Sequence, residues 1–258
     1  MNPSVPEKMK AAAIDRFGGP EVIHTALLPV PEPGPRQVLI RLDVAGIGVW
    51  DPWVREGGLE TQKTGFPRVI GNDGAGVVVA VAADVTRFSV GDPVYAFSMD
   101  GGFYAEYVAV DEDNVAGIPA GLRPDEAGAL GADAAVDGRK DDVKQAARAF
   151  APEGINAALV LANGRGLLDA LSAIREGGRV AYPNGVEPAP DVPEGVEALA
   201  YDGTPDRDIL ERLNALIGSG PFHVELGKTY RLDDASAAHR EIEQHHLGKL
   251  ALRVRAQA

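Results

Sequence analysis

Two polar residues enclosed by glycines are the first candidates for chemistry. Asn72 and Asp73 stand between Gly71 and Gly74, and glycines let the backbone approach a ligand closely. An amide beside a carboxylate can hydrogen-bond a carbonyl or an amide of a small molecule. The competing interpretation is that the pair only forms a tight turn, which Asn and Asp favour without any ligand.

A second candidate group is aromatic. Trp50 and Trp53 flank Asp51 and could stack on a conjugated ring such as a quinone or an enone. Alternatively, a tryptophan packs in a core and Asp51 caps a short helix that follows Trp50. Tyr95 points to one face of a predicted strand at 93–97, where it either lines a cleft or packs in the core.

Two Asn-Gly segments follow predicted strands at 155–162 and 179–183. They contain Asn163, Gly164, Pro183, Asn184 and Gly185. If the strands are parallel, both segments lie at the carboxyl edge of the sheet, where open α/β sheets bind ligands. The alternative is ordinary turn chemistry, which Asn-Gly satisfies unaided.

Composition removes several classes of function. The 258 residues contain no cysteine, which excludes disulfides, thiolate nucleophiles and zinc sites that use sulfur. The formal net charge of −13 disfavours binding to nucleic acid or to anionic lipid. No apolar stretch is long enough for a membrane helix, and the first residues lack an apolar signal core. We therefore expect a soluble, cytoplasmic protein whose partner is a small molecule, with no nucleic acid and no membrane as partner.

The elements that must position these residues begin with a β-rich region. Residues 9–119 contain short β-branched or alternating runs, separated by turns rich in glycine and proline. This pattern is typical of a compact antiparallel, barrel-like domain. The predicted strands are 10–14, 37–44, 76–82, 93–97 and 104–110, and a short helix is predicted at 51–56.

From residue 131 predicted strands and helices alternate, which implies a parallel sheet covered by helices. The strands are predicted at 134–136, 155–162, 179–183 and 197–201, and the helices at 142–150, 166–175 and 206–217. A strand at 228–232, a helix at 233–246 and a strand at 249–254 return to the first domain. Gly248 is predicted to adopt the left-handed conformation that ends a helix.

Four glycine-rich motifs, in this order and spacing, resemble the medium-chain dehydrogenase/reductases. They are residues 45–51 (AGIGVWD), 67–76 (PRVIGNDGAG), 88–95 (FSVGDPVY) and 101–107 (GGFYAEY). The second half continues the resemblance at 131–133 (GAD), 176–180 (EGGRV) and 245–250 (HHLGKL). Within this superfamily the chain is most similar to the zinc-independent quinone oxidoreductase branch. The resemblance implies an α/β fold with a GroES-like barrel domain and a Rossmann-like parallel sheet.

The resemblance also bears on metal binding. Zinc-dependent relatives have their ligands where this chain has Gly48, Asn72 and Asp73. Glycine cannot ligate and asparagine is a poor zinc ligand, so no zinc is expected. His245 and His246 are adjacent on a predicted helix and point apart, which disfavours a joint metal site. Zinc-free relatives imply NADPH as cofactor, with hydride transfer to a quinone or an electron-poor double bond.

Candidate site residues follow from the resemblance. The substrate cleft would be lined by Gly48, Val49, Trp50, Asp51, Asn72, Asp73 and Tyr95. The cofactor would contact Asn163, Gly164, Pro183, Asn184, Gly185 and Lys249. For Lys249 the alternative is a solvated lysine at the start of a strand. No catalytic residue follows from the sequence.

The chain departs from the family where the dinucleotide should bind. A complete G-x-G-x-x-G turn between a strand and a helix is missing, and the nearest candidate has Gly164 and Gly166 but Asp169 at the third position. Residues 124–130 resemble the end of the catalytic domain, whereas 131–133 resemble the third strand of the nucleotide domain. Two βα units are therefore missing. We predict a catalytic domain at 1–130 and 223–258, and a shortened nucleotide domain at 131–222 with strand order 3-4-5-6.

Three functional interpretations remain open. The first is an NADPH-dependent reductase of quinones or activated alkenes with impaired cofactor binding and activity. The second is a cofactor-free small-molecule binder, or a non-redox enzyme, that uses the cleft between the predicted domains. The third is an inactive form from which part of a domain has been deleted. A homodimer is expected in each case, because relatives pair through the strand near 197–201, and the apolar run at 155–162 is a second pairing edge if no strand covers it.

Overall fold

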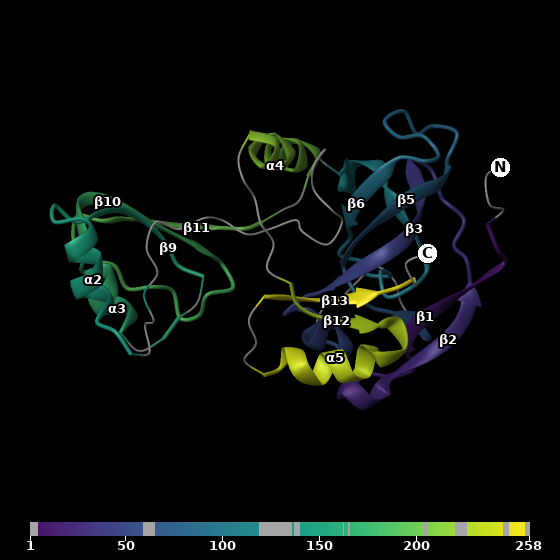
Figure 1. The fold of residues 1–258 in the computed structure, drawn as a ribbon, viewed down its shortest axis with the longest axis horizontal. Coiled ribbons are helices and arrows are strands. Elements are labelled where there is room, and N and C mark those ends of the chain that lie inside the picture. The colour runs from purple at the N-terminus through teal and green to yellow at the C-terminus, as the bar shows by residue number, and fades with distance from the viewer. Residues whose placement is uncertain are drawn as a thin grey trace. The chain divides into compact units, whose positions relative to one another are not determined.

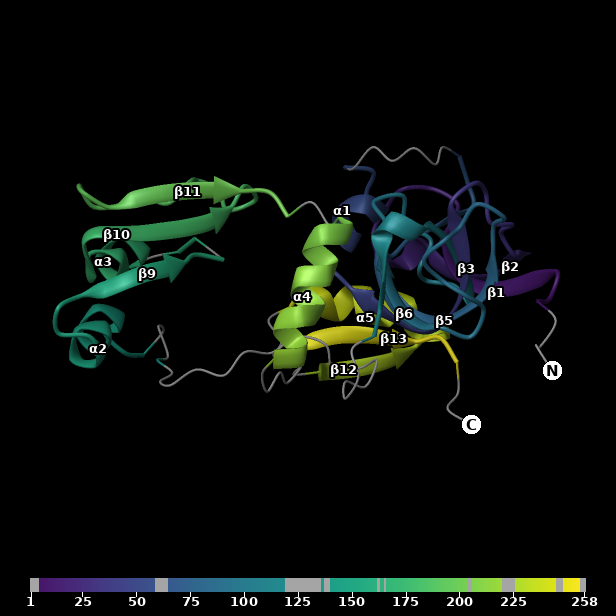
Figure 2. The same cartoon turned by 90° about the horizontal axis from the view of Figure 1, so that it is seen from above.

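The computed structural model describes residues 5–58, 65–118, 136, 140–161, 163–164, 166–203, 206–219, 226–244 and 248–255. The chain divides into two compact units (Figures 1 and 2). The first unit comprises residues 1–131 and 205–258, and the second comprises residues 132–204. The second unit is therefore an insertion in the first. No helix of the described ranges is long and apolar enough to cross a membrane.

The first unit is built from two sheets. The larger has the order β12-β13-β3-β5-β6-β8, with β7 also paired to β3, and the smaller has the order β2-β1-β4. The strands are β1 (Lys8–Ile14), β2 (Ile23–Pro29), β3 (Gln37–Ile47), β4 (Arg68–Val69), β5 (Asp73–Val81), β6 (Pro93–Phe97), β7 (Tyr107–Asp111), β8 (Val115–Gly117), β12 (Leu226–Arg231) and β13 (Lys249–Arg253). All pairs are antiparallel except β12 with β13. The predicted antiparallel, β-rich domain is confirmed.

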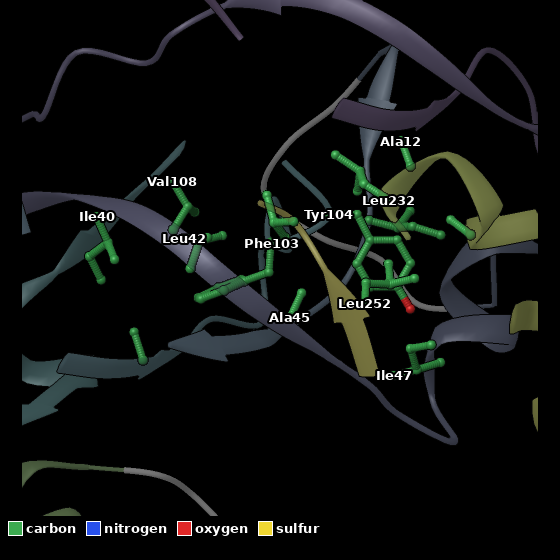
Figure 3. Close-up of a cluster of buried hydrophobic side chains, with 14 of the residues drawn as sticks. Ala12, Ile40, Leu42, Ala45, Ile47, Phe103, Tyr104, Val108, Leu232 and Leu252 are labelled. Carbon is green, nitrogen blue, oxygen red and sulfur yellow. The ribbon is translucent and has the colours of Figure 1, made fainter. Parts of the chain in front are cut away.

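The core of the first unit forms on the inner faces of these strands. Alternation along β3 turns Ile40 and Leu42 inward, and Figure 3 shows them with Val108, Phe103 and Leu252. Full burial of each aliphatic side chain contributes roughly 1.5–3 kcal/mol. The helices of this unit are α1 (Asp51–Arg55), α4 (Arg207–Ser219) and α5 (Ala235–Ile242), with 3-10 turns η1 (Pro20–Val22), η2 (Glu112–Asn114) and η3 (Leu232–Asp234).

Helix α4 packs on the first unit, although its residues are predicted in the second. The Tyr95 hydroxyl donates to Asn214 Oδ1 over 3.0 Å, and Asn214 Nδ2 donates to the Gly117 carbonyl over 3.0 Å. Arg207 forms an ion pair with Asp113. The division of the structure at residue 205 thus differs from the predicted boundary at 222, because an amphipathic period does not tell which surface the helix covers.

The second unit contains a parallel sheet in the order β11-β10-β9. Its strands are β9 (Ile155–Leu159), β10 (Ile174–Pro183) and β11 (Glu197–Tyr201). Helices α2 (Val143–Phe150) and α3 (Leu167–Leu171) lie on one face of it (Figures 1 and 2). The predicted parallel sheet is confirmed, whereas residues 134–135 of the predicted first strand lie outside the described residues.

The predicted helix at 166–175 is wrong in its second half. Helix α3 ends at Leu171, and Ile174 already pairs with Ile155 in the sheet. The strand therefore begins at Ile174 rather than at Arg179, with a register shift between these two residues. Gly177, with a φ of +72°, lies within this irregularity. Burial of Ile174 in the core of the second unit overrides the helical pattern of the sequence.

Strand β11 carries a testable expectation about assembly. It is an edge of the described sheet, and Leu199 on it is 60% exposed. An apolar edge recruits another strand, so we expect a homodimer that Leu199→Lys dissociates at roughly 50 µM. Sedimentation velocity measures this change, with Leu159→Lys on the opposite edge as the matched control. A monomeric unmodified chain would contradict the expectation, and a dimer sensitive only to Leu159→Lys would move the interface to β9.

Candidate functional site

Residues from three segments meet on the side of the larger sheet where β3 ends and where β5 and β13 begin. We call this place the site edge. Strand β3 ends at Ile47, whereas β5 begins at Asp73 and β13 begins at Lys249. Because β3 is antiparallel to both β5 and β13, the end of β3 lies beside the starts of the other two. Gly48 continues directly from this edge. The structure therefore brings together the predicted cleft residues that lie on these segments.

Asp73 lies against β3 at this edge. A Cβ atom at Gly46 would lie 2.0 Å from Asp73 Oδ1, so glycine is required for the carboxylate to take this place. Asp73 Oδ2 is 3.5 Å from Lys249 Nζ, and both side chains are partly exposed. An ion pair of this kind adds little stability. Both charges therefore remain accessible to a ligand.

Asn72 has one satisfied and one unsatisfied polar atom. Its Nδ2 donates to the Ser98 carbonyl over 2.7 Å, whereas its buried Oδ1 has no hydrogen-bond partner within the ranges that the structure describes. A buried acceptor without a partner costs about 1–3 kcal/mol. Because Oδ1 accepts, the ligand group that suits it is a hydroxyl or an amide N–H; of the carbonyl and the amide expected from the sequence, only the amide fits.

The two tryptophans lie on the surface beside this edge. Trp50 is 57% exposed and Trp53 is 45% exposed, and their ring centroids are 5.7 Å apart at an interplanar angle of 50°. The core-packing interpretation is therefore wrong for both. Val49 is also exposed. Together these side chains form an apolar surface on which a flat ring could stack.

Beneath this surface, four buried polar side chains form a continuous chain of contacts. The Tyr104 hydroxyl donates to Asp51 Oδ2 over 2.7 Å and lies 3.2 Å from His239 Nε2. Arg55 Nη1 is 3.0 Å from His239 Nδ1. Because a guanidinium only donates, Nδ1 accepts and Nε2 carries the proton. Donation thus runs from Arg55 through His239 and Tyr104 to Asp51, and we call these residues the buried chain.

Asp51 belongs to the buried chain and does not cap α1. Trp50 occupies the N-cap position, and Asp51 is the first residue of the helix. Its Oδ2 also accepts from the Gly48 backbone N–H over 2.8 Å. Asp51 therefore fixes the turn that carries Gly48, Val49 and Trp50.

The other members of the buried chain are absent from the sequence-based site. Arg55 and His239 are 184 residues apart in sequence, and no spacing rule links them. Tyr104 lies within the motif GGFYAEY, which is the one signal that pointed to it. Arg55 is further held by Nε donation to the Gly18 carbonyl over 2.9 Å and by Glu243 at 3.0 Å.

Burial shifts the ionisation of this chain. It raises the pKa of Asp51 to about 6, although the Tyr104 hydrogen bond opposes the change. Burial, helped by the nearby Arg55 charge, lowers the pKa of His239 to about 3. The pKa of Tyr104 is raised well above its usual value by burial and by Asp51. At neutral pH, His239 and Tyr104 are therefore uncharged and Asp51 is mostly ionised.

These pKa shifts predict opposite pH dependences of stability. The pKa of Asp51 is about 6 in the folded chain, whereas its ordinary value is 3.8, so this group lowers the free energy of unfolding as pH rises through that window. The pKa of His239 is about 3 in the folded chain, whereas its ordinary value is 6.5, so this group raises the free energy of unfolding as pH rises from about 3 to 6.5. The two contributions oppose each other between about pH 4 and 6.

Asp51→Asn removes only the contribution of Asp51, which lowers the free energy of unfolding as pH rises. Between pH 4 and 6, the free energy of unfolding of the variant should rise relative to the unmodified chain by about 3 kcal/mol. Urea unfolding followed by tryptophan fluorescence reports the first unit, since both tryptophans lie in it. His239→Gln is the matched control. Between pH 4 and 6, its free energy of unfolding should fall relative to that of the unmodified chain. Parallel pH curves for all three proteins would contradict the assignment.

Tyr95 is engaged within the first unit. It lies on β6, and its hydroxyl donates to Asn214 on α4. Burial raises its pKa. The hydroxyl therefore helps to hold α4.

In the second unit, the five predicted cofactor residues gather at the carboxyl edge of the sheet. Parallel pairing of β9 with β10 places Asn163 and Gly164 beside the turn that starts at Pro183. Asn163 Nδ2 donates to the Pro188 carbonyl over 2.6 Å, and its Oδ1 accepts from the Gly164 N–H over 2.8 Å. The sixth residue, Lys249, belongs to the first unit.

The described residues of the second unit do not fit a dinucleotide pyrophosphate. The helix that follows β9 is α3, which has five residues and begins after Gly166 with a φ of +87°. A pyrophosphate site needs consecutive backbone N–H groups at the start of a longer helix. Here the Gly164 N–H is already bonded to Asn163.

The first unit does not fit zinc either. The described ranges contain no group of three or more His, Cys, Asp or Glu side chains that could hold a metal ion. Asp73 faces the ammonium of Lys249 and Asp51 accepts from Tyr104, so both carboxylates have other partners. His245 and His246 lie outside the described residues.

Comparison with known proteins matches most of the chain. Residues 34–120 match the alcohol dehydrogenase GroES-like domain family, and residues 130–252 match the zinc-binding dehydrogenase family. Quinone oxidoreductase of Mus musculus is 33% identical over 124 residues, which cover 48% of this chain and 37% of the relative. A trans-enoyl reductase of Fusarium mangiferae is 38% identical over 130 residues, or 50% of this chain and 33% of the relative. The aligned segments thus span about a third of these curated relatives.

Solved structures show the same fold. An NAD-dependent alcohol dehydrogenase superposes with a TM-score of 0.79 at 24% identity, covering 96% of this chain and 100% of the other. The quinone oxidoreductase of Coxiella burnetii superposes with a TM-score of 0.68 at 18% identity, with the same coverage of 96% and 100%. At these identities the likeness concerns the fold.

Proposed function

Because this chain belongs to the medium-chain dehydrogenase/reductase superfamily, in its quinone oxidoreductase-like group, we propose that it is a zinc-independent reductase of quinones or activated alkenes with an impaired site for NADPH. The family implies a nicotinamide cofactor, which supplies a hydride when bound. The first unit keeps the residues that would bind the substrate. Among its described residues, the second unit has no helix start suited to the pyrophosphate.

The observation that carries this proposal is the site edge of the first unit. An exposed tryptophan pair lies on a turn that Asp51 fixes from below. Asn72, on the neighbouring segment, has a buried acceptor that lacks a hydrogen-bond partner among the described residues. A quinone gains hydroxyl groups when it is reduced, and an unsatisfied buried acceptor suits a hydroxyl better than a carbonyl. This preference favours the product side of the reaction.

Buried polar groups would support this site from below. Tyr104 donates to the Asp51 carboxylate, His239 contacts the Tyr104 hydroxyl, and Asp51 holds the Gly48 backbone. We assign them positioning roles, because Asp51 is 2% exposed and is therefore shielded from the surface. Lys249 supplies a cation at the same edge, which would favour the negative charge that develops on a substrate oxygen.

Quinone binding tests the substrate half without any cofactor. Titration with 1,4-naphthoquinone should quench Trp50 and Trp53 saturably, because a stacked ring lies in contact with them. Asn72→Ala should weaken binding of the corresponding hydroquinone about tenfold. Asn156→Ala, on exposed β9 of the second unit, is the matched control. Quenching that rises linearly without saturation would contradict the proposed substrate site.

NADPH turnover separates the reductase from the alternatives. Slow reduction of the quinone by NADPH that Asn72→Ala abolishes would support the reductase. Saturable quinone binding without any turnover would instead favour a cofactor-free small-molecule binder or a non-redox enzyme. The observation that favours this cofactor-free alternative is that the described residues of the second unit do not fit a pyrophosphate. Absence of both binding and turnover would favour an inactive, shortened form.

A further inference from the structure

The first unit carries a pocket that the proposed reaction does not use. Four cationic side chains line it: Lys10 from β1, Arg231 from the end of β12, and Arg253 and Arg255 from the end of β13 and just beyond. We call it the basic pocket. It lies at the opposite end of β13 from Lys249, and its described lining residues all belong to the first unit.

The floor of the basic pocket is apolar. Leu232 and Val254 line it, and both side chains are buried. Its volume is about 440 Å³, and sites for small molecules typically measure about 300–1,000 Å³. The pocket therefore offers a cationic rim over an apolar base, with room for a small organic molecule.

Only one carboxylate faces these cations among the described lining residues. Asp233 accepts from Lys10 Nζ over 2.6 Å and from Thr25 Oγ1 over 3.1 Å. Its other cation is Arg231, at 3.5 Å, whose side chain is 79% exposed. The side chains of Arg253 and Arg255 have no hydrogen bond or ion pair with any described residue. Two guanidinium groups therefore lack a counter-charge within the part of the chain that the structure describes.

The strand register forces like charges together. Arg231 and Arg253 are paired in register on the parallel strands β12 and β13, which lie about 4.8 Å apart. Arg255 is on the same side as Arg253, because the intervening Val254 is buried and still bonds to the Asp43 carbonyl. Like charges on neighbouring strands are unfavourable. A bound anion would relieve this repulsion, and a pocket of this charge is unusual in a chain of net charge −13.

We propose that the basic pocket binds a small molecule that carries a phosphate group on an apolar body. Guanidinium groups match phosphate oxygens with paired hydrogen bonds, and the floor suits the apolar part. The strong local charge at Arg253 and Arg255 favours a dianion over a monoanion. This site is independent of the proposed reductase activity, because it involves neither NADPH nor the site edge.

Isothermal titration with phenyl phosphate tests the chemistry of the ligand. We expect a dissociation constant below about 1 mM, several-fold weaker binding of inorganic phosphate, and no binding of phenol. This order follows because the phosphate supplies the charge and the ring supplies contact with Leu232 and Val254. Absence of saturable phenyl phosphate binding would overturn the proposal, and so would equal binding of phenol.

Variants test the location. The double substitution Arg253→Gln with Arg255→Gln should weaken phenyl phosphate binding by about tenfold or more, whereas Arg16→Gln, at an exposed arginine outside the pocket, should leave it unchanged. Asp233→Asn should tighten binding, because it removes the competing carboxylate. Tryptophan fluorescence confirms folding of each variant. Unchanged binding in the folded double variant would refute the site.

Discussion

Titration with NADPH is expected to give no saturable change in nicotinamide fluorescence up to about 1 mM. The pyrophosphate site of the fold depends on a glycine turn and on the N-terminus of a helix. Neither is complete in the described ranges, where α3 has five residues and the Gly164 N–H bonds to its own neighbour. The remaining edge residues, Asn163 and Asn184, could contact only the nicotinamide half of the cofactor.

The control for this titration is a full-length quinone oxidoreductase measured under the same conditions. Its saturable fluorescence change would show that the assay detects binding. A micromolar dissociation constant for the present chain would contradict the expectation and would restore an efficient reductase. Competition by adenosine 2′,5′-bisphosphate would then locate the binding, because it lacks the nicotinamide.

Replacement of Arg55 by Met is expected to lower the free energy of unfolding of the first unit by about 3–5 kcal/mol. The guanidinium is fully buried and donates to Gly18, His239 and Glu243. Met fills similar space but leaves the carbonyl and the imidazole nitrogen without a donor. Urea unfolding followed by tryptophan fluorescence at pH 7 measures the loss.

Arg240→Met on α5 is the matched control. That arginine is exposed, and its guanidinium donates to Ser236 in the same helix. We expect its effect to stay within about 0.5 kcal/mol. A loss below about 1 kcal/mol for Arg55→Met would mean that the buried chain does not hold the turn at Gly48. The pH dependence assigned to Asp51 and His239 would then need another explanation.

Some strands were predictable because their hydrophobic pattern in the sequence agrees with the pairing that they adopt in the sheet. The strands predicted at 93–97 and 197–201 coincide with β6 and β11. Gly248 has a φ of +75°, which confirms its predicted left-handed conformation. Strand β2 was not predicted, because most of its side chains are partly or fully exposed. Its strand conformation depends on pairing with β1, which the sequence pattern does not show. The end of α3 was misplaced for the same reason, since pairing of Ile174 with Ile155 is a tertiary contact.

The candidate site was predictable only in part. Glycine-rich motifs located Gly48, Asp51, Asn72 and Asp73, which antiparallel pairing then brings to one edge. Local sequence could not show that Tyr104 and His239 lie beneath them, because that contact joins residues 135 positions apart. The sequence could not show the free acceptor on Asn72 either, since it depends on which atom of the side-chain amide bonds to the Ser98 carbonyl.

The insertion of the second unit into the first has a consequence for biosynthesis. Residues Val44 to Ile47 of β3 complete their pairing with β13, which the ribosome makes about 200 residues later. At typical rates of synthesis this delay is roughly 10–40 s. Meanwhile the second unit is made from one continuous segment and can fold first, while residues Val44 to Ile47 of β3 offer free backbone groups to chaperones or to other nascent chains. Strand β13, the last of the described strands to be synthesised, thus completes the pairing of β3, one of the first.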